Sequence, residues 1–543
     1  MSNDNQPVLA IYDIRGKQEF IFRTNKIQEI VGASWIIRDC FKDYLFPAAN
    51  EIVKHDPEKK GIYSYKEDPD PKPFSDGISD GYIGEVVYDG GGNFLVVFES
   101  ESAFKEVTYE FTKRVTRATG TLRILATCVP VTNGYEDYKL DEKELYAKHR
   151  IAEAQESNLS PWACIPIVQV ERKTSQPLYD YEHDAESGWS DLDRDIQESI
   201  KSKDVHGKLT KESYAKLKKF FVQNEKEGGI YKLNEKILDN IVEEKGVDSQ
   251  LAIIYIDGNN MGAKVQQKTE KTSSYSACSD TLRGFSDEIQ RIYVDEGLKR
   301  ALEPVNNDDS FRVIVSAGDE INFIVKAKDA FSCAKNYLDY LKDIGKDGGE
   351  KASACAGIAV FHSHAPYADA YRIAEEACES GKKRMKETEL QTACFVDFHI
   401  CQGAIGVSLE QIRCDENGGE NNLSRPWLVW SDDSDVKTDK ITEYETIERV
   451  VSILEQFSRS NVKGLATASK KGDVEMTMEL NRMYSHLSNE KKDIIKDYWK
   501  WLTTKLDAGV RRRLLYDVSI AYDLWFDRKG HNSKDSVNPS GID

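Results

Sequence analysis

The sequence lacks any apolar run long enough to cross a membrane. Its longest apolar stretches, such as residues 251–256, fall far short of the roughly 20 residues that span a bilayer. The opening segment MSNDNQPVLAIYDI has neither the basic start nor the small-residue cleavage site of a signal peptide. We therefore expect a cytoplasmic protein with no membrane partner.

Paired cysteines are also lacking. The 10 cysteines are scattered from Cys40 to Cys414 and never form a Cys-x-x-Cys pair. This spacing excludes a disulfide framework and a paired zinc knuckle, so most cysteines should be small buried hydrophobic residues. With 14 prolines, 40% hydrophobic and 31% charged residues, the composition is that of an ordinary soluble protein.

The chain has fewer basic than acidic residues. The chain has 74 Lys and Arg against 93 Asp and Glu, a formal net charge of −19. This balance argues against a uniformly basic nucleic-acid coat but permits a local basic groove. A chain of 543 residues is too long to fold around one hydrophobic core. Because a domain usually contains about 100 to 200 residues, we expect three or four domains.

The same succession of elements is predicted twice. In the first half, strand, helix, hairpin, helix and strand are expected at residues 8–12, 27–45, 84–98, 103–118 and 122–129. In the second half they are expected at residues 251–256, 281–302, 311–325, 330–344 and 354–361, with a further helix at 367–383. This β-α-β-β-α-β order is the ferredoxin-like arrangement of an α+β fold, and it places the first strand's end beside the central hairpin. Helical spacing beyond residue 440 predicts a C-terminal α-helical bundle.

The second repeat brings acidic residues together. Asp257 ends a buried strand, and Asp319 and Glu320 lie at the tip of the neighbouring hairpin. Clustered carboxylates repel one another unless cations offset their charge, and Mg²⁺ prefers oxygen ligands together with substrate phosphates. The pattern therefore predicts a two-metal phosphoryl- or nucleotidyl-transfer site, with Gly318 leaving room for a triphosphate at the turn.

Three segments of the second half carry a family resemblance: residues 251–262, Ser316-Ala-Gly-Asp-Glu320, and Ala356-Gly-Ile-Ala-Val-Phe361 with the helix that ends Ser380-Gly-Lys-Lys383. They resemble the second Palm domain of the large subunit of type III CRISPR effector complexes, a family related to GGDEF nucleotidyl cyclases and adenylyl cyclase Palm domains. Gln18-Glu-Phe-Ile21, Val31-Gly-Ala-Ser34 and Gly91-Gly-Asn-Phe94 resemble the family's first Palm domain. The similarity covers about residues 8–400, and the helical tail resembles the family's C-terminal bundle.

The resemblance implies an enzyme that joins ATP into cyclic oligoadenylate second messengers of antiviral defence. Asp257 and Asp319 would hold Mg²⁺ or Mn²⁺, and Glu320 takes the fourth place of the family's Gly-Gly-Asp-Asp tetrad as a ligand or orienting acid. Lys382 matches the family's lysine that meets the triphosphate. Asn260 matches a polar position that could meet a ribose or base, although a turn asparagine is the alternative.

The chain also departs from the family. It begins at the first Palm domain, without the family's His-Asp nuclease domain, and the region near residues 170–177 has no zinc-binding cysteines. Ala317 replaces the first glycine of the tetrad, which still leaves room at the turn. The first hairpin carries Asn93 and Phe94 where the second has two acids, so we expect that half to have lost metal binding and to shape the site or the fold.

These observations predict the following organisation: a first Palm domain (1–174), a charged, partly helical connector (175–247) with helical spacing at 209–221, a catalytic second Palm domain (248–405), a linker (406–439), a helical bundle (440–528) and a flexible tail (529–543). Basic clusters at Arg511-Arg-Arg513 and residues 463–471 are expected to be solvated faces, with contact to guide RNA or a neighbouring subunit as the alternative. Expected partners are ATP and, in a complex, crRNA-bound type III subunits and target RNA. The competing hypotheses are a standalone cyclic dinucleotide synthase in anti-phage signalling, which would work as a homodimer, and a non-catalytic scaffold subunit.

Overall fold

The computed structural model divides the chain into two compact units, Met1–Asn234 with Asn260–Arg291 and Glu235–Asn259 with Ile292–Asp543. It describes residues 6–75, 77–90, 93–156, 168–172, 174–179, 198–200, 209–226, 238, 241–242, 249–305, 310–344, 351–402, 406–419, 422–432 and 441–525. The expected tail at 529–543 and most of the expected connector at 175–247 lie outside the described residues.

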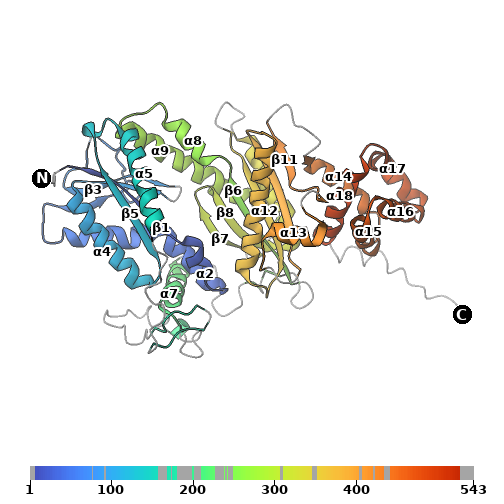
Figure 1. The fold of residues 1–543 in the computed structure, drawn as a ribbon, viewed down its shortest axis with the longest axis horizontal. Helices are drawn as coiled ribbons and strands as arrows, with labels where there is room; N and C mark the ends of the chain where they lie inside the picture. The colour runs from blue at the N-terminus through green and yellow to red at the C-terminus, as the bar shows by residue number, and fades with distance from the viewer. Residues whose placement is uncertain are drawn as a thin grey trace. The chain divides into compact units, whose positions relative to one another are not determined.

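The first unit contains a five-stranded mixed sheet in the order β2-β3-β4-β1-β5. Its strands β1, β3 and β5 are labelled in Figure 1. Its strands are β1 (Val8–Arg15), β2 (Lys60–Tyr63), β3 (Tyr82–Gly90), β4 (Asn93–Phe98) and β5 (Arg123–Pro130). Its helices are α1 (Lys17–Phe22), α2 (Ile27–Arg38), the π-helix η1 (Phe41–Leu45), α3 (Phe46–Ile52), α4 (Glu101–Thr119), α5 (Tyr138–Gln155), α7 (Lys211–Lys226), α8 (Met261–Thr269) and α9 (Tyr275–Ile289). The predicted order of strands and helices is therefore present, although the single helix expected at 27–45 is divided.

The central strand β1 explains why helices cover both faces of this sheet. Because side chains alternate along a strand, Tyr12 faces α4, where its ring lies 5.7 Å from that of Phe111. Leu9 and Ile11 face the other way, into a buried cluster with residues of α5 and α9. One apolar strand thus supplies both layers of the core.

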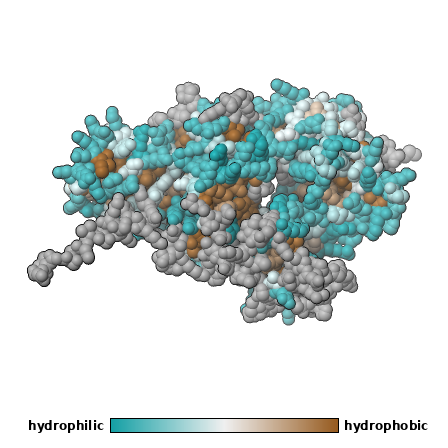
Figure 2. Space-filling model, turned by 180° about the vertical axis from the view of Figure 1, so that it is seen from behind, coloured by the Kyte–Doolittle hydropathy of each residue, from teal (hydrophilic) through white to brown (hydrophobic). Residues whose placement is uncertain are grey.

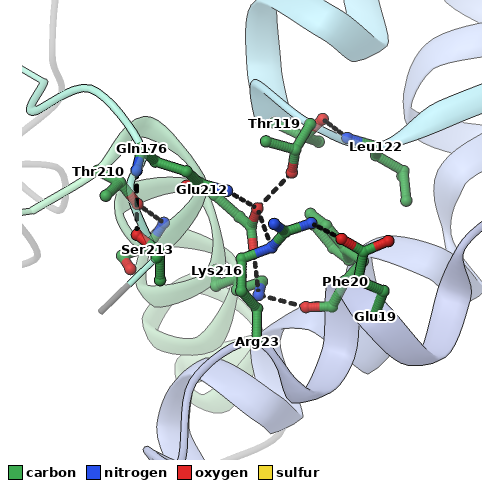
Figure 3. Close-up of polar contacts among 12 residues, drawn as sticks. Glu19, Phe20, Arg23, Thr119, Leu122, Gln176, Thr210, Glu212, Ser213 and Lys216 are labelled. Atoms are coloured by element: carbon green, nitrogen blue, oxygen red, sulfur yellow. Dashed lines mark hydrogen bonds and ion pairs between the residues drawn. The ribbon is translucent and has the colours of Figure 1, made fainter. Parts of the chain in front are cut away.

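Helix α7, which falls within the charged segment expected to be a connector, packs against α2 and buries part of its charge. Glu212 accepts hydrogen bonds from Gln176 at 2.8 Å and Lys216 at 2.6 Å, and Lys216 also donates to the carbonyl of Phe20 (Figure 3). Arg23 reaches the same carboxylate at 3.2 Å. Burial lowers the pKa of Lys216, with the charge of Glu212 acting in the opposite direction. The charges of this helix are therefore partly internal to the first unit.

The second unit contains a seven-stranded mixed sheet in the order β12-β11-β10-β9-β6-β8-β7. Its strands are β6 (Gln250–Gly258), β7 (Phe311–Ala317), β8 (Glu320–Lys326), β9 (Ala354–His362), β10 (Ala393–Ile400), β11 (Trp427–Ser431) and β12 (Thr442–Glu443). Its helices up to β11 are the π-helix η4 (Gln290–Glu296), which begins at the unit boundary, α10 (Gly297–Ala301), α11 (Ala330–Asp343), α12 (Tyr367–Glu387) and α13 (Leu409–Asn417). The segment 406–439, expected to be a linker, includes α13 and a strand that pairs with β10, because the short apolar run at 427–431 completes the sheet.

Helices close the second unit: α14 (Tyr444–Leu454), α15 (Arg459–Lys471), α16 (Asp473–Ser485), α17 (Asn489–Thr504), α18 (Ala508–Ile520) and α19 (Tyr522–Trp525). Buried ion pairs join them to the sheet. Asp517 of α18 accepts hydrogen bonds from the backbone and hydroxyl of Ser424, and Arg425 lies 3.4 Å from the same carboxylate. On the sheet side, Arg413 donates to Asp397 of β10 at 2.8 Å. The α+β architecture with a C-terminal helical region is thereby confirmed.

The described surface is mostly hydrophilic on the face shown in Figure 2, with hydrophobic residues in smaller areas. Among the described residues, no helix combines the length and apolar character needed to cross a bilayer.

Candidate functional site

The site begins at the end of β6. Residues 251–256 of this strand are buried, and Asp257 is the first side chain to reach solvent, with 28% of its surface exposed. In the antiparallel ladder Asp257 lies opposite Glu320 of β8. A strand held on both sides thus fixes the position of its terminal carboxylate.

The second acidic residue comes from the hairpin between β7 and β8. Ala317 pairs with Glu320, so Gly318 and Asp319 form a two-residue loop. Gly318 has φ of 64°, the left-handed conformation that glycine adopts without steric cost. A Cβ at this position would meet nothing within 4 Å. Glycine is needed for the backbone conformation, and the space above the turn is open.

Helix α12 carries Lys382 to the same place. Gly357 of β9 permits the close approach of this helix, because a Cβ there would lie 1.9 Å from the carbonyl oxygen of Ala374. The Nζ atom of Lys382 lies 2.5 Å from Oδ2 of Asp257. The structure therefore brings Asp257, Asp319, Glu320 and Lys382 together.

Burial and mutual repulsion shift the acids of this site. Burial, followed by the charge of Asp257, raises the pKa of Asp319 to about 6 and that of Glu320 to about 7. Burial lowers the pKa of Lys382, but the charge and hydrogen bond of Asp257 outweigh it, so the net shift is upward. Three carboxyl groups thus share one nearby ammonium group, and the site has a deficit of positive charge.

Two further residues support the acids and were not predicted. Tyr371 donates a hydrogen bond to Glu320 at 3.2 Å, and it precedes Lys382 by 11 residues, or three helical turns, on α12. The buried Asn259 donates to the carbonyl of Ala393 at 2.9 Å and fixes the chain just after Asp257. Helical spacing back from Lys382 could have identified Tyr371, whereas nothing local distinguishes Asn259 from its neighbour.

Asn260 belongs to the first unit, where it precedes α8. It is exposed, has φ of 59° and makes no side-chain cap to the helix. Asparagine tolerates this conformation better than most residues, which fits the alternative of a turn residue. Its predicted contact with ribose or base stays a prediction.

The first hairpin differs from the prediction in its register. Gly90 pairs with Asn93, so Asn93 corresponds by position to Glu320. Phe94, which was expected to replace an acid, is buried in the core. The prediction was wrong by one residue because three consecutive glycines leave the start of the loop undefined in the sequence.

The donors of the second repeat fit a divalent cation chemically. Their oxygens are the ligands that Mg²⁺ prefers, and a cation would relieve the repulsion that raises the two pKa values. In the part of the chain that the structure describes, no group of three or more His, Cys, Asp or Glu side chains is already arranged to hold a metal ion. Lys382 instead contacts Asp257, so the metal roles of Asp257, Asp319 and Glu320 stay predictions.

Comparisons with known proteins identify the domain that contains this site. Residues 250–390 match the sequence model of the second palm domain of Cas10/Cmr2. No curated protein shows significant similarity to the chain. A crystal structure of a Csm1–Csm4 cassette in complex with cA4 contains a chain that superposes with a TM-score of 0.50 at 12% identity, covering 95% of this chain and 70% of that chain.

A second solved structure gives the same result. The Csm1–Csm4 subcomplex of the type III-A CRISPR-Csm interference complex aligns with a TM-score of 0.50 at 12% identity, over 96% of this chain and 69% of that chain. At this identity the similarity establishes the fold, and the predicted family resemblance is confirmed. Residues 250–390 match the Cas10/Cmr2 second palm model, and the chain as a whole shares the fold of a chain in the Csm1–Csm4 structures.

Proposed function

We propose that the chain is a nucleotidyltransferase that converts ATP into cyclic oligoadenylates in type III CRISPR antiviral defence. The observation that carries the proposal is the meeting of Asp257, Asp319 and Glu320 beside Lys382, inside a domain of the Cas10/Cmr2 second palm family. A cluster of acids with too little positive charge suits a substrate that arrives with divalent cations, as nucleoside triphosphates do.

In the proposed reaction, the 3′-oxygen of one ATP forms a bond to the α-phosphorus of another, and the bond to the β-phosphate breaks to release pyrophosphate. The hydroxyl proton passes to solvent or substrate. Mg²⁺ or Mn²⁺ held by Asp257, Asp319 and Glu320 would offset phosphate charge and activate the hydroxyl. Cyclisation repeats the same step between the ends of one oligoadenylate.

Lys382 has two roles in this proposal. Without substrate, its ammonium group compensates Asp257 at 2.5 Å. When cations take over that compensation, Lys382 can turn to the triphosphate as a point positive charge. Gly318 leaves the hairpin tip open to the phosphates, and Tyr371 orients Glu320 through its hydroxyl.

Partners follow from the fold. We propose that the chain works with crRNA-bound type III subunits and that target RNA controls its activity. The first palm domain would then shape the fold or the nucleotide site without holding metal, since the tip of its hairpin, residues 90–93, carries no acids.

The experiment is incubation of the purified chain with each labelled nucleoside triphosphate and Mn²⁺, with and without co-purified RNA, followed by mass spectrometry of the products. Cyclic adenylates of three or more units would support the proposal, and cyclic dinucleotides would move it to a standalone synthase. Asp319→Asn should remove the products while leaving the circular dichroism spectrum unchanged. Continued synthesis by this variant would contradict the assigned site.

A non-catalytic scaffold is the second candidate, and one observation favours it. Among the described residues, the ammonium group of Lys382 forms an ion pair with Asp257, and no group of side chains is already arranged to hold a metal ion. If neither RNA nor Mn²⁺ yields product, while guide RNA and small RNA-binding subunits co-purify, the scaffold is the better description.

A further inference from the structure

A pocket of about 180 Å³ lies in the second unit, where α13 meets the C-terminal helices α15 and α18. It shares no residue with the site around Asp257. It is larger than a cavity for a single water molecule. Its walls are polar, which raises the question of what it binds.

Two atoms of neutral polar side chains in the lining are buried and make no hydrogen bond to the part of the chain that the structure describes. Ser469 is only 2% exposed, and its Oγ makes no hydrogen bond. The Nδ2 atom of Asn417 is also buried and unpartnered. The hydroxyl of Tyr516 donates to Oδ1 of Asn417 at 2.5 Å, which fixes the amide with its donor side unused. Buried polar groups without partners are rare in folded proteins, and here both border one pocket.

Two cations border the same pocket. Lys470 lies over the ring of Tyr516, with Nζ 5.6 Å from the ring centroid. Arg512 uses its Nε edge on Asp473 at 2.9 Å, and a guanidinium group has further N–H donors. The one acidic residue of the lining, Glu416, is exposed. The pocket therefore offers two positive charges, a buried amide donor and a buried hydroxyl.

We propose that this pocket binds a phosphate group, either as inorganic phosphate or as part of a small phosphate ester. Lys470 and Arg512 would supply charge-assisted hydrogen bonds, while Ser469 and Asn417 would gain the partners that the protein does not give them. Because α13 follows the sheet and α15 and α18 belong to the helical region, the bound phosphate would tie these two parts of the second unit together. The basic residues that the sequence placed on solvated faces thereby include members of a site.

The test is calorimetric titration of the full chain with inorganic phosphate and, in a separate arm, with AMP. Divalent cations are omitted and sodium chloride keeps the ionic strength constant. We expect saturable one-site binding by the natural chain. Lys470→Gln and Arg512→Gln should each weaken it about tenfold, as expected for one charge-assisted hydrogen bond. Tighter binding of AMP would identify an ester as the ligand, and tighter binding of phosphate would identify the free anion.

Matched variants separate this site from general charge effects and from the nucleotide site. Lys471→Gln removes the neighbouring exposed charge outside the pocket and should bind as the natural chain does. Binding that Lys382→Gln removes belongs to the nucleotide site, whereas binding that it leaves should still be weakened by Lys470→Gln, so a failure of the proposed nucleotidyltransferase leaves this result intact. Ser469→Ala should bind more weakly, yet without phosphate it should melt at the same temperature or higher, because it removes an unpartnered hydroxyl.

The proposal is overturned if neither probe shows saturable binding below about 10 mM, a dissociation constant weaker than any specific site would need. In that case the pocket holds water only. Equal affinities for the natural chain, Lys470→Gln and Ser469→Ala would overturn it as well, because binding would then lie elsewhere.

Discussion

Glu320→Gln should stabilise the protein at alkaline pH, although it removes a residue of the candidate site. The carboxyl group of Glu320 is buried and lies near the negative charge of Asp257. Burial first, and then this charge, raise its pKa from 4.5 to about 7. A raised carboxyl pKa means that the folded state binds the proton more tightly than the unfolded state. The contribution of Glu320 to stability is therefore most favourable below pH 4.5 and is lost as pH rises through 7.

The magnitude follows from the two pKa values. The difference between 4.5 and about 7 corresponds to about 3 kcal/mol in the free energy of unfolding at pH 8 and above. Glutamine has nearly the same shape and keeps an oxygen that can accept the hydrogen bond of Tyr371. The variant should therefore be more stable than the natural protein at pH 8.5, and the difference should vanish near pH 4.5.

The assay is urea denaturation at pH values from 5 to 9 in the presence of EDTA, with Glu448→Gln as the control. Glu448 is an exposed carboxylate on α14, so this variant makes the same chemical change away from the acidic cluster. Addition of Mg²⁺ at pH 8.5 should stabilise the natural protein more than Glu320→Gln, because the cation offsets the same repulsion. Parallel stability profiles of the natural protein and Glu320→Gln across this pH range would refute the reasoning.

Three further changes test the packing and chemistry around the site. Lys382→Gln should lower cyclic oligoadenylate formation at least about tenfold, as judged by mass spectrometry, because it removes the cation beside Asp257 while the fold is kept. Gly357→Ala should lower the free energy of unfolding by about 2 to 3 kcal/mol in urea, since a methyl group there overlaps the backbone of α12, whereas Gly262→Ala, whose Cβ meets nothing, should not destabilise the chain. Arg413→Met should cost about 3 to 5 kcal/mol, measured in the same way, because it leaves the buried Asp397 without its closest cation.

Strand and helix order could be read from the sequence because the sheets have clear apolar periodicity. Residues 251–256 are apolar throughout and are buried on both faces, as the observed strand β6 requires. The approach of Asp257 to Asp319 and Glu320 followed from that order, since a β-α-β-β-α-β unit sets the first strand against the hairpin. The chemical roles of these residues were inferred from residue type and family, and they stay predictions.

The features that the sequence did not reveal depend on long-range packing. The helical spacing at residues 209–221 predicted a helix where α7 lies, but it did not predict that Lys216 and Glu212 would compensate each other in the interior. Strand β11 is only five residues long and completes the sheet through its partner β10, a pairing that no local pattern specifies. The role of Gly357 depends on the position of α12 in the same way.

The two sheets also show how corresponding strand ends can differ in charge. In the first sheet Tyr12 pairs with Phe94, so the next residue, Asp13, stands by position where Asp257 stands in the second sheet. Asp13 contacts Arg15 at 2.9 Å and Lys17 at 3.7 Å, and the tip of its hairpin, residues 90–93, contributes no acids. Arg15 also pairs with Glu153 and Glu156, and Arg123 pairs with Glu156, so three carboxylates here meet three cations. This balance needs no metal for compensation, whereas three carboxylates with one cation do. The strand-end aspartate alone therefore does not define a metal site, and the balance of charge supplied by the hairpin assigns the predicted chemistry to the second sheet.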